Sequence, residues 1–150
     1  MKKFIGLAFL AMVFSFAACA QKNVPSKAQD AFNQKFPKAQ NVSWDKEGSS
    51  IWEAEFKLDG KEMSANYDAD GNWKETEEEI QQNEVPSVVN DALHSNYPSA
   101  TVNHVFKVEN IEGIAYEYEI KNNGNKMEIV VDSAGKIKKS EPGDEEDEED

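Results

Sequence analysis

The feature that most constrains the fold of this chain is an internal duplication. Val24-Pro25-Ser26 returns 61 residues later as Val85-Pro86-Ser87, and beyond a three-residue insertion near 103–111 the offset becomes 64 residues. Such repetition predicts two copies of one structural unit, over residues 24–80 and 85–139. The matching pairs are Phe36-Pro37 with Tyr97-Pro98, Trp52 with Tyr116, Phe56 with Ile120, Gly60 with Gly124, Met63 with Met127, Asp68 with Asp132 and Gly71 with Gly135.

Each copy is predicted to begin with a helix. Pro25 and Pro86 suit a first helical turn, where a missing backbone N–H is tolerated. Pro37 and Pro98 end the two helices, because proline cannot continue one. Between them, apolar residues recur at the i, i+3, i+4 spacing of a helix with one buried face: Ala28, Ala31 and Phe32 in the first copy, and Val89, Ala92 and Leu93 in the second.

Four strands follow each helix. Apolar and charged residues alternate over 51–58 and 116–121, and the dipeptides Asp59-Gly60 and Asn123-Gly124 are typical of hairpin turns. The sequence therefore predicts an α+β protein with two tandem α-β-β-β-β repeats, each a helix packed on an antiparallel meander sheet. Whether the repeats form one sheet or two stays open. The polar segment 76–84 is predicted to connect them.

The first twenty residues are predicted to be a secretory signal peptide. Lys2 and Lys3 precede an apolar run over 4–16, which is too short to span a bilayer. Two cleavage sites are consistent with the residues that follow. The signal ends at Ala18 if Cys19 becomes the acylated first residue of a lipoprotein, or it ends at Ala20 in a plain small-x-small site. Either way we expect a periplasmic protein, anchored to the membrane only if Cys19 is acylated.

The charge of the chain excludes some classes of partner. Its net charge is −13, it has no arginine, and eight of its 29 acidic residues lie in 141–150. This last segment is predicted to be a disordered acidic tail. Nucleic acid is excluded as a partner, because binding to phosphates needs clustered cations. We likewise expect no docking on an anionic membrane surface without the lipid.

No pattern of catalytic or metal-binding residues is found. Cys19 is the only cysteine, so the folded part has neither a disulfide nor a thiolate ligand, and His94 and His104 lack metal-ligand spacing. Asp68-Ala69-Asp70-Gly71 has the acids of a calcium loop, but a hairpin turn explains what it shares with 132–135. We therefore expect a protein that is not an enzyme and holds no cofactor or metal ion.

The candidate binding surface is an acidic face of the predicted sheet. Trp52, Phe56 and Tyr67 share the strand phase of the predicted core, so the alternating glutamates lie on the opposite face. We expect this face to be solvated, so that replacing its glutamates by glutamine hardly changes stability. Its partner should be basic. The candidate residues are Glu53, Glu55, Glu62, Glu117, Glu119 and Glu128.

The order of these motifs resembles a known family. That order is Val-Pro-Ser, a helix, Pro, then Trp-x-Ala-x-Phe, Gly and Asp-x-x-Gly, and it is given twice over 24–139. In the order of its motifs the chain resembles the PepSY-like family of exported proteins. That family is described as similar in fold to the beta-lactamase-inhibitory protein. The resemblance implies the tandem α+β fold, an extracytoplasmic location and a role as a binder or inhibitor of another protein. It implies no catalytic activity.

Two functions remain open at this point. The first is a non-catalytic extracytoplasmic binding or inhibitor-like module for a protein or peptide. The alternative is a passive structural or calcium-buffering lipoprotein, in which the acidic tail at 141–150 binds calcium weakly.

The lipoprotein interpretation predicts that Cys19 carries the acyl chains of the mature protein in its native host. Mass spectrometry of the mature N-terminus should find a modified cysteine there. An unmodified start at Gln21 would contradict the prediction and leave the protein without a lipid anchor.

Overall fold

The computed structural model describes residues 23–142. The predicted signal peptide, Cys19 and most of the predicted tail lie outside these residues. The elements are, in order, α1 (Ser26–Lys35), β1 (Gln40–Glu47), β2 (Ile51–Leu58), β3 (Lys61–Asp68), β4 (Trp73–Glu79), a 3-10 turn (Gln82–Glu84), α2 (Ser87–Asn96), β5 (Thr101–Asn110), β6 (Gly113–Asn122), β7 (Asn125–Asp132) and β8 (Ile137–Pro142).

The eight strands form one antiparallel sheet in the order of the sequence, from β1 to β8. This answers whether there is one sheet or two. The sheet continues through the middle of the chain because β4 pairs with β5, with Glu77 opposite Val108. The segment 76–84, predicted to be a connector, therefore begins inside a central strand. Its polar composition was misleading because pairing and burial in a sheet override the strand propensity of single residues.

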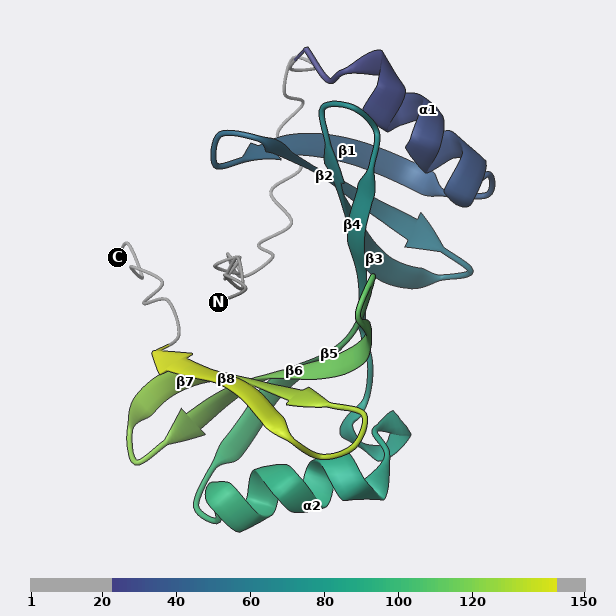
Figure 1. Cartoon of the computed structure of the whole chain (residues 1–150). Coiled ribbons are helices and arrows are strands. Elements are labelled where there is room, and N and C mark those ends of the chain that lie inside the picture. The colour runs from purple at the N-terminus through teal and green to yellow at the C-terminus, as the bar shows by residue number, and fades with distance from the viewer. Residues whose placement is uncertain (1–22, 143–150) are drawn as a thin grey trace, which may run out of the picture.

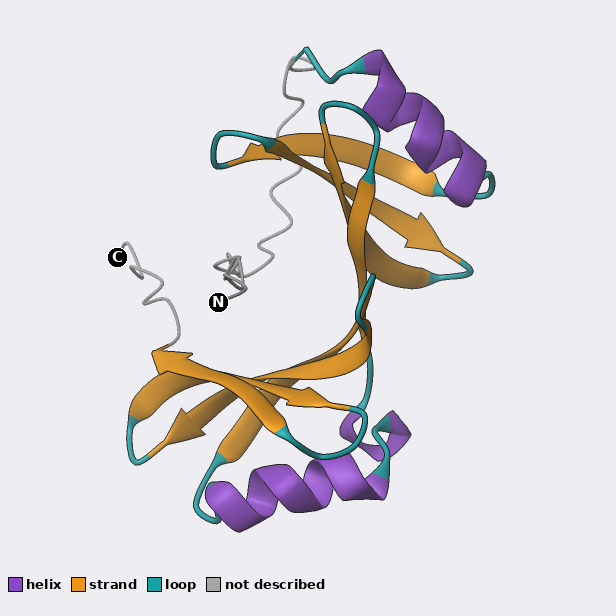
Figure 2. Cartoon of the chain, viewed as in Figure 1, coloured by secondary structure: helices purple, strands orange, loops and turns teal. Residues whose placement is uncertain are grey.

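The sheet is strongly bent, and both helices lie on its outer side (Figure 1). Helix α1 covers the part of the sheet formed by the first strands, and α2 covers the part formed by the last ones (Figure 2). The inner side of the bend has no helix on it. We call this uncovered side the concave face.

The core beneath α1 is aromatic. Phe32 of α1 lies with its ring 5.0 Å from that of Phe56 and 5.4 Å from that of Trp44, both edge to face. Tyr67 is fully buried in the same cluster. Trp52 is also buried, with 9% of its surface exposed, so the expectation that Trp52, Phe56 and Tyr67 face the interior is confirmed.

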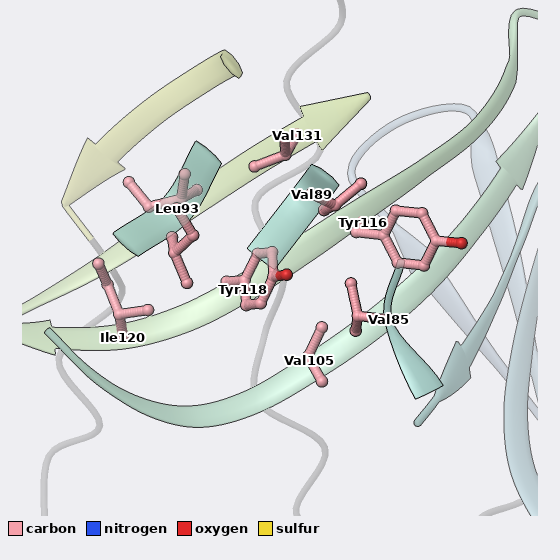
Figure 3. Close-up of a cluster of buried hydrophobic side chains, with 9 residues drawn as sticks. Val85, Val89, Leu93, Val105, Tyr116, Tyr118, Ile120 and Val131 are labelled. Carbon is pink, nitrogen blue, oxygen red and sulfur yellow. The ribbon is translucent and has the colours of Figure 1, made fainter. Parts of the chain in front are cut away.

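The core beneath α2 is mainly aliphatic. Val89 and Leu93 of the helix pack on Ile129 and Val131 of β7 (Figure 3). Tyr118 is buried among them, and its hydroxyl donates a hydrogen bond to Asn90 Oδ1 at 3.0 Å. Each helix therefore has a separate core of its own, and the two cores share one sheet.

The two Asp-x-x-Gly motifs are turns that bring a hairpin against a helix. The carboxylate of Asp68 accepts hydrogen bonds from the backbone N–H groups of Asp70 and Asn72. Hydrogen bonds from Lys74 and Asn72 hold the pKa of Asp68 below its ordinary value. Gly71 has a φ of +84° and lies so close to α1 that a Cβ there would be 2.5 Å from the Lys27 carbonyl oxygen.

Gly135 repeats this arrangement at the other helix. Its φ is +83°, and a Cβ there would be 2.9 Å from the carbonyl oxygen of Val88. The glycine is required for two reasons, since the backbone is left-handed and the helix approaches closely.

Within 23–142, no helix is long and apolar enough to cross a membrane.

We predict that Gly71→Ala destabilises the protein by clearly more than Gly60→Ala. Both glycines have a positive φ, but nothing lies within 4 Å of a Cβ at Gly60. Gly60→Ala should cost about 1 kcal/mol, from backbone strain alone. Gly71→Ala adds a clash with α1 and should cost roughly twice as much or more. Urea unfolding of both variants measures the difference, and equal midpoints would contradict the close packing of turn on helix.

Candidate functional site

The six glutamates predicted from the sequence lie together on the concave face. Strand pairing places Glu53 opposite Asn66, Glu55 opposite Ser64 and Glu119 opposite Glu128, all in the phase opposite to the buried residues beneath the helices. The charged groups that the register places on this face are Asp45 and Glu47 of β1; Glu53, Glu55 and Lys57 of β2; Glu62 and Asp68 of β3; Glu75, Glu77 and Glu79 of β4; His104 of β5; Glu117, Glu119 and Lys121 of β6; Lys126, Glu128 and Asp132 of β7; and Lys139 of β8.

This face is less solvated than the sequence predicts. Glu117 and Glu128 expose only 8% and 7% of their surface, while Glu53, Glu55, Glu62 and Glu119 are half-buried. The expectation of a freely solvated acidic face is therefore wrong at its centre. The sheet is bent with this face on its inner side (Figure 1). Such a bend brings the side chains of the inner face closer together.

The central strand supplies acids that the sequence analysis missed. Glu75 and Glu77 of β4 lie on the concave face, and Glu77 is 4% exposed. Glu77 is missed because the sequence predicts a connector over 76–84, and Glu75 comes directly before that segment. The alternation of Glu75, Thr76 and Glu77 was a weak signal, since glutamates occupy both phases of this strand.

Several buried oxygens on the concave face accept no hydrogen bond. Among the described residues these are Glu47 Oε2, Ser64 Oγ, Asn66 Oδ1, Glu77 Oε2 and Glu117 Oε1. The amide nitrogen of Asn66 does have a partner, since it donates to Glu75 Oε1 at 3.1 Å. Buried polar groups normally have partners, so five such oxygens on one face are exceptional.

Burial and mutual repulsion keep protons on these carboxyl groups. Burial, followed by the charge of Glu117, raises the pKa of Glu77 well above its ordinary value. Burial and the nearby Glu47 raise the pKa of Glu53 to about 7. Burial and Glu128 raise the pKa of Glu117 to about 9. Burial and Glu75 raise the pKa of Glu47. Residues of β1, β2, β4, β6 and β7 therefore belong to one interacting cluster.

The cations of the face lie around this cluster. Lys57 pairs with Glu62 at 2.9 Å, Lys139 with Glu128 at 3.1 Å, and His104 Nδ1 lies 2.7 Å from Glu79 Oε1. In the part of the chain that the structure describes, no ion pair includes Glu53, Glu77 or Glu117. The centre of the face therefore has more carboxyl groups than the cations around it pair with.

Other candidate chemistry is not assembled. His94 is exposed on α2, next to Gln82, and is remote in the fold from His104 on β5. Across residues 23–142, no group of three or more His, Cys, Asp and Glu side chains is arranged to hold a metal ion. The Asp68 carboxylate is occupied by its own turn and by Lys74, at 2.8 Å.

We predict that the protein loses stability as the pH rises from 5 to 9. A carboxyl whose pKa is raised in the folded protein makes its full contribution to stability at a pH below the ordinary pKa of a glutamate. This contribution is lost as the pH rises through the folded-state pKa, which is about 7 for Glu53 and about 9 for Glu117. Each carboxyl that keeps its proton adds a slope of about 1.4 kcal/mol per pH unit. Glu77→Gln and Glu117→Gln should flatten this slope and be more stable than the native protein at pH 9.

Urea unfolding at several pH values measures this dependence. Glu109→Gln is the matched control, because Glu109 is exposed and lies on the other side of β5. Parallel stability profiles for the native protein and the two central variants would show that these carboxyls do not retain their protons.

Comparison with known proteins identifies the family. The profile of the family described as "Putative beta-lactamase-inhibitor-like, PepSY-like" matches residues 51–139, which is more than half of the chain. No curated protein matches.

Solved structures share the fold. A BLIP-like protein from Bacteroides fragilis superimposes with a TM-score of 0.69 at 25% identity, over 81% of this chain and 89% of that chain. A DUF2874 family protein from Bacteroides uniformis gives 0.72 at 22% identity, over 79% and 88%. A protein from Bacteroides eggerthii, described as a putative periplasmic protein, gives 0.73 at 18% identity, over 81% and 90%. With an α+β fold of one bent eight-stranded sheet and two helices, this chain belongs to the PepSY-like, beta-lactamase-inhibitor-like family.

Proposed function

We propose that this protein is a non-catalytic, extracytoplasmic binding module whose concave face recognises a basic protein or peptide. The observation that carries the proposal is the gathering of carboxyl groups on one sheet face that neither helix covers. Complementary charge speeds encounter with a partner and selects against wrong ones. A partner rich in lysine or arginine complements this face best.

The family supports a binding role. Its description is inhibitor-like, and the Bacteroides fragilis relative is described as BLIP-like. The location rests on two arguments of different kinds, the signal peptide predicted over residues 1–20 and the periplasmic description of the Bacteroides eggerthii protein. Acylation of Cys19 would add a membrane anchor.

We infer further that the binding module is built from two copies of one unit, residues 24–80 and 85–139. The order of one helix and four strands occurs twice, and each helix has its own core. The two glycine turns, Gly71 against Lys27 and Gly135 against Val88, contact equivalent positions of the two helices. On this proposal, the partner contacts acids from both copies at once.

A quadruple variant tests the proposed function. Glu53, Glu55, Glu117 and Glu119 are replaced by glutamine, and capture of partners from periplasmic extract is compared with that of the native protein at ionic strengths of about 0.05 M and about 0.3 M. The native protein should capture a basic partner that is released at the higher salt. The variant should capture it poorly at both, because the attraction that salt screens has been removed.

A second quadruple variant is the control for net charge. Asp30→Asn, Asp91→Asn, Glu109→Gln and Glu112→Gln replace the same number of acidic residues at exposed positions on the helices and on a hairpin. This control should retain the partner. Capture that survives in the concave-face variant, or that is lost equally in both, would contradict the proposal.

A further inference from the structure

We propose that the centre of the concave face binds the guanidinium group of an arginine side chain presented by the partner. This inference rests on the proposed function and specifies its central contact. It follows from the kind of group that the face leaves without a partner, from the residues between these groups, and from the lack of an ion pair to Glu77 or Glu117 among the described residues.

Most of the unpartnered groups are hydrogen-bond acceptors when the carboxyls are ionised. Glu47 Oε2, Asn66 Oδ1, Glu77 Oε2 and Glu117 Oε1 are buried oxygens on one face, and Asn66, Glu77 and Glu117 are each more than nine-tenths buried. The other unpartnered group on this face is Ser64 Oγ, a hydroxyl that accepts as well as donates. A matching ligand therefore supplies several donors, which describes a cation with N–H groups.

The register places two of these carboxyls on either side of an apolar strip. Glu77 lies opposite Val108, Val108 lies opposite Ala115, and Glu117 follows two residues after Ala115 on the same strand. Neighbouring strands are about 4.8 Å apart, so β4 and β6 are separated by roughly 10 Å. Neither Val108 nor Ala115 offers a hydrogen-bonding side chain. A long side chain can lay its aliphatic stem on this strip while its charged end reaches the acids.

Among cationic side chains, arginine fits this arrangement best. Its guanidinium has five N–H donors in a planar fork, whereas the three donors of a lysine ammonium act around one point. The carboxyls of Glu77 and Glu117, whose charges act on each other, can therefore be engaged together by a fork better than by a point charge. A bare metal ion is disfavoured, because the acids here are not grouped as metal ligands within residues 23–142.

Binding should release protons. Burial raises the pKa values of Glu53, Glu77 and Glu117 in the free protein, whereas a guanidinium beside them favours the ionised carboxylates. The affinity for an arginine ligand should therefore rise between pH 6 and pH 8.5. The other charged groups of the face, given above for every strand, also affect the binding of a cation. A neutral analogue of arginine is therefore needed to isolate the effect of the guanidinium charge.

The test is a titration of the full chain with three short peptides, followed by NMR of the glutamate side-chain carboxyl carbons. The probes are Ac-Gly-Arg-Ala-Gly-NH₂ and its lysine and citrulline counterparts, citrulline being nearly isosteric with arginine but uncharged. We expect the arginine peptide to shift the signals of Glu77 and Glu117, to bind at least about tenfold more tightly than the citrulline peptide, and to gain affinity with pH.

Variants locate the contact. Glu77→Gln and Glu117→Gln should each weaken binding of the arginine peptide about tenfold or more, while Glu109→Gln should leave it unchanged. Both central variants are expected to be at least as stable as the native protein, so lost binding would not reflect unfolding. Equal binding of the arginine and citrulline peptides, tighter binding of the lysine peptide, or shifts confined to other surfaces would each overturn the proposal.

These outcomes are distinguishable from failure of the proposed function. If the periplasmic partner is captured through the concave face but the arginine peptide does not shift Glu77, the face is a binding surface and only the arginine contact is wrong. If neither concave-face variants nor salt affect the partner, the proposed function itself fails, whatever the peptides do.

Discussion

The pairing of β4 with β5 is the interaction on which the rest of this structure depends. Through it, two helix-covered sheets that could have stood apart become one continuous sheet of eight strands. Only a continuous and bent sheet brings Glu77 of β4 near Glu117 of β6. Without the pairing of β4 with β5, the carboxylates of each strand would be exposed to water, as carboxylates on protein surfaces usually are.

The resulting cluster works against stability. Burying a carboxyl without a partner costs free energy, and the protein reduces this cost by keeping protons on Glu53, Glu77 and Glu117. Violations of the ordinary rules of burial are typical of functional sites, because a ligand can supply what the free protein lacks. The two apolar cores beneath the helices show no comparable gathering of acids, so the violation is confined to the face proposed to bind.

Much of the fold could be predicted because its signals are local. Alternation over 51–58 correctly separated Trp52 and Phe56 from Glu53 and Glu55, since strand side chains point alternately to opposite faces. The glycine turns were visible in the sequence as Asp-x-x-Gly. Only the structure shows that Gly71 is also required because a Cβ there would lie 2.5 Å from a backbone oxygen of α1. The predicted connector over 76–84 is wrong over 76–79, where glutamates in both phases hid the end of a central strand.

The sequence by itself determined most of the secondary structure, the inward and outward phase of the strands that alternate clearly, and the sign of the charge on the uncovered face. These follow from periodicity and turn chemistry, which act between near neighbours. Only the tertiary structure decided that the halves share one sheet, that the acidic face is concave, and that Glu77 and Glu117 are buried. The physical reason is that proximity between strands distant in the sequence, and the pKa shifts that it causes, depend on sheet pairing and curvature rather than on any local pattern.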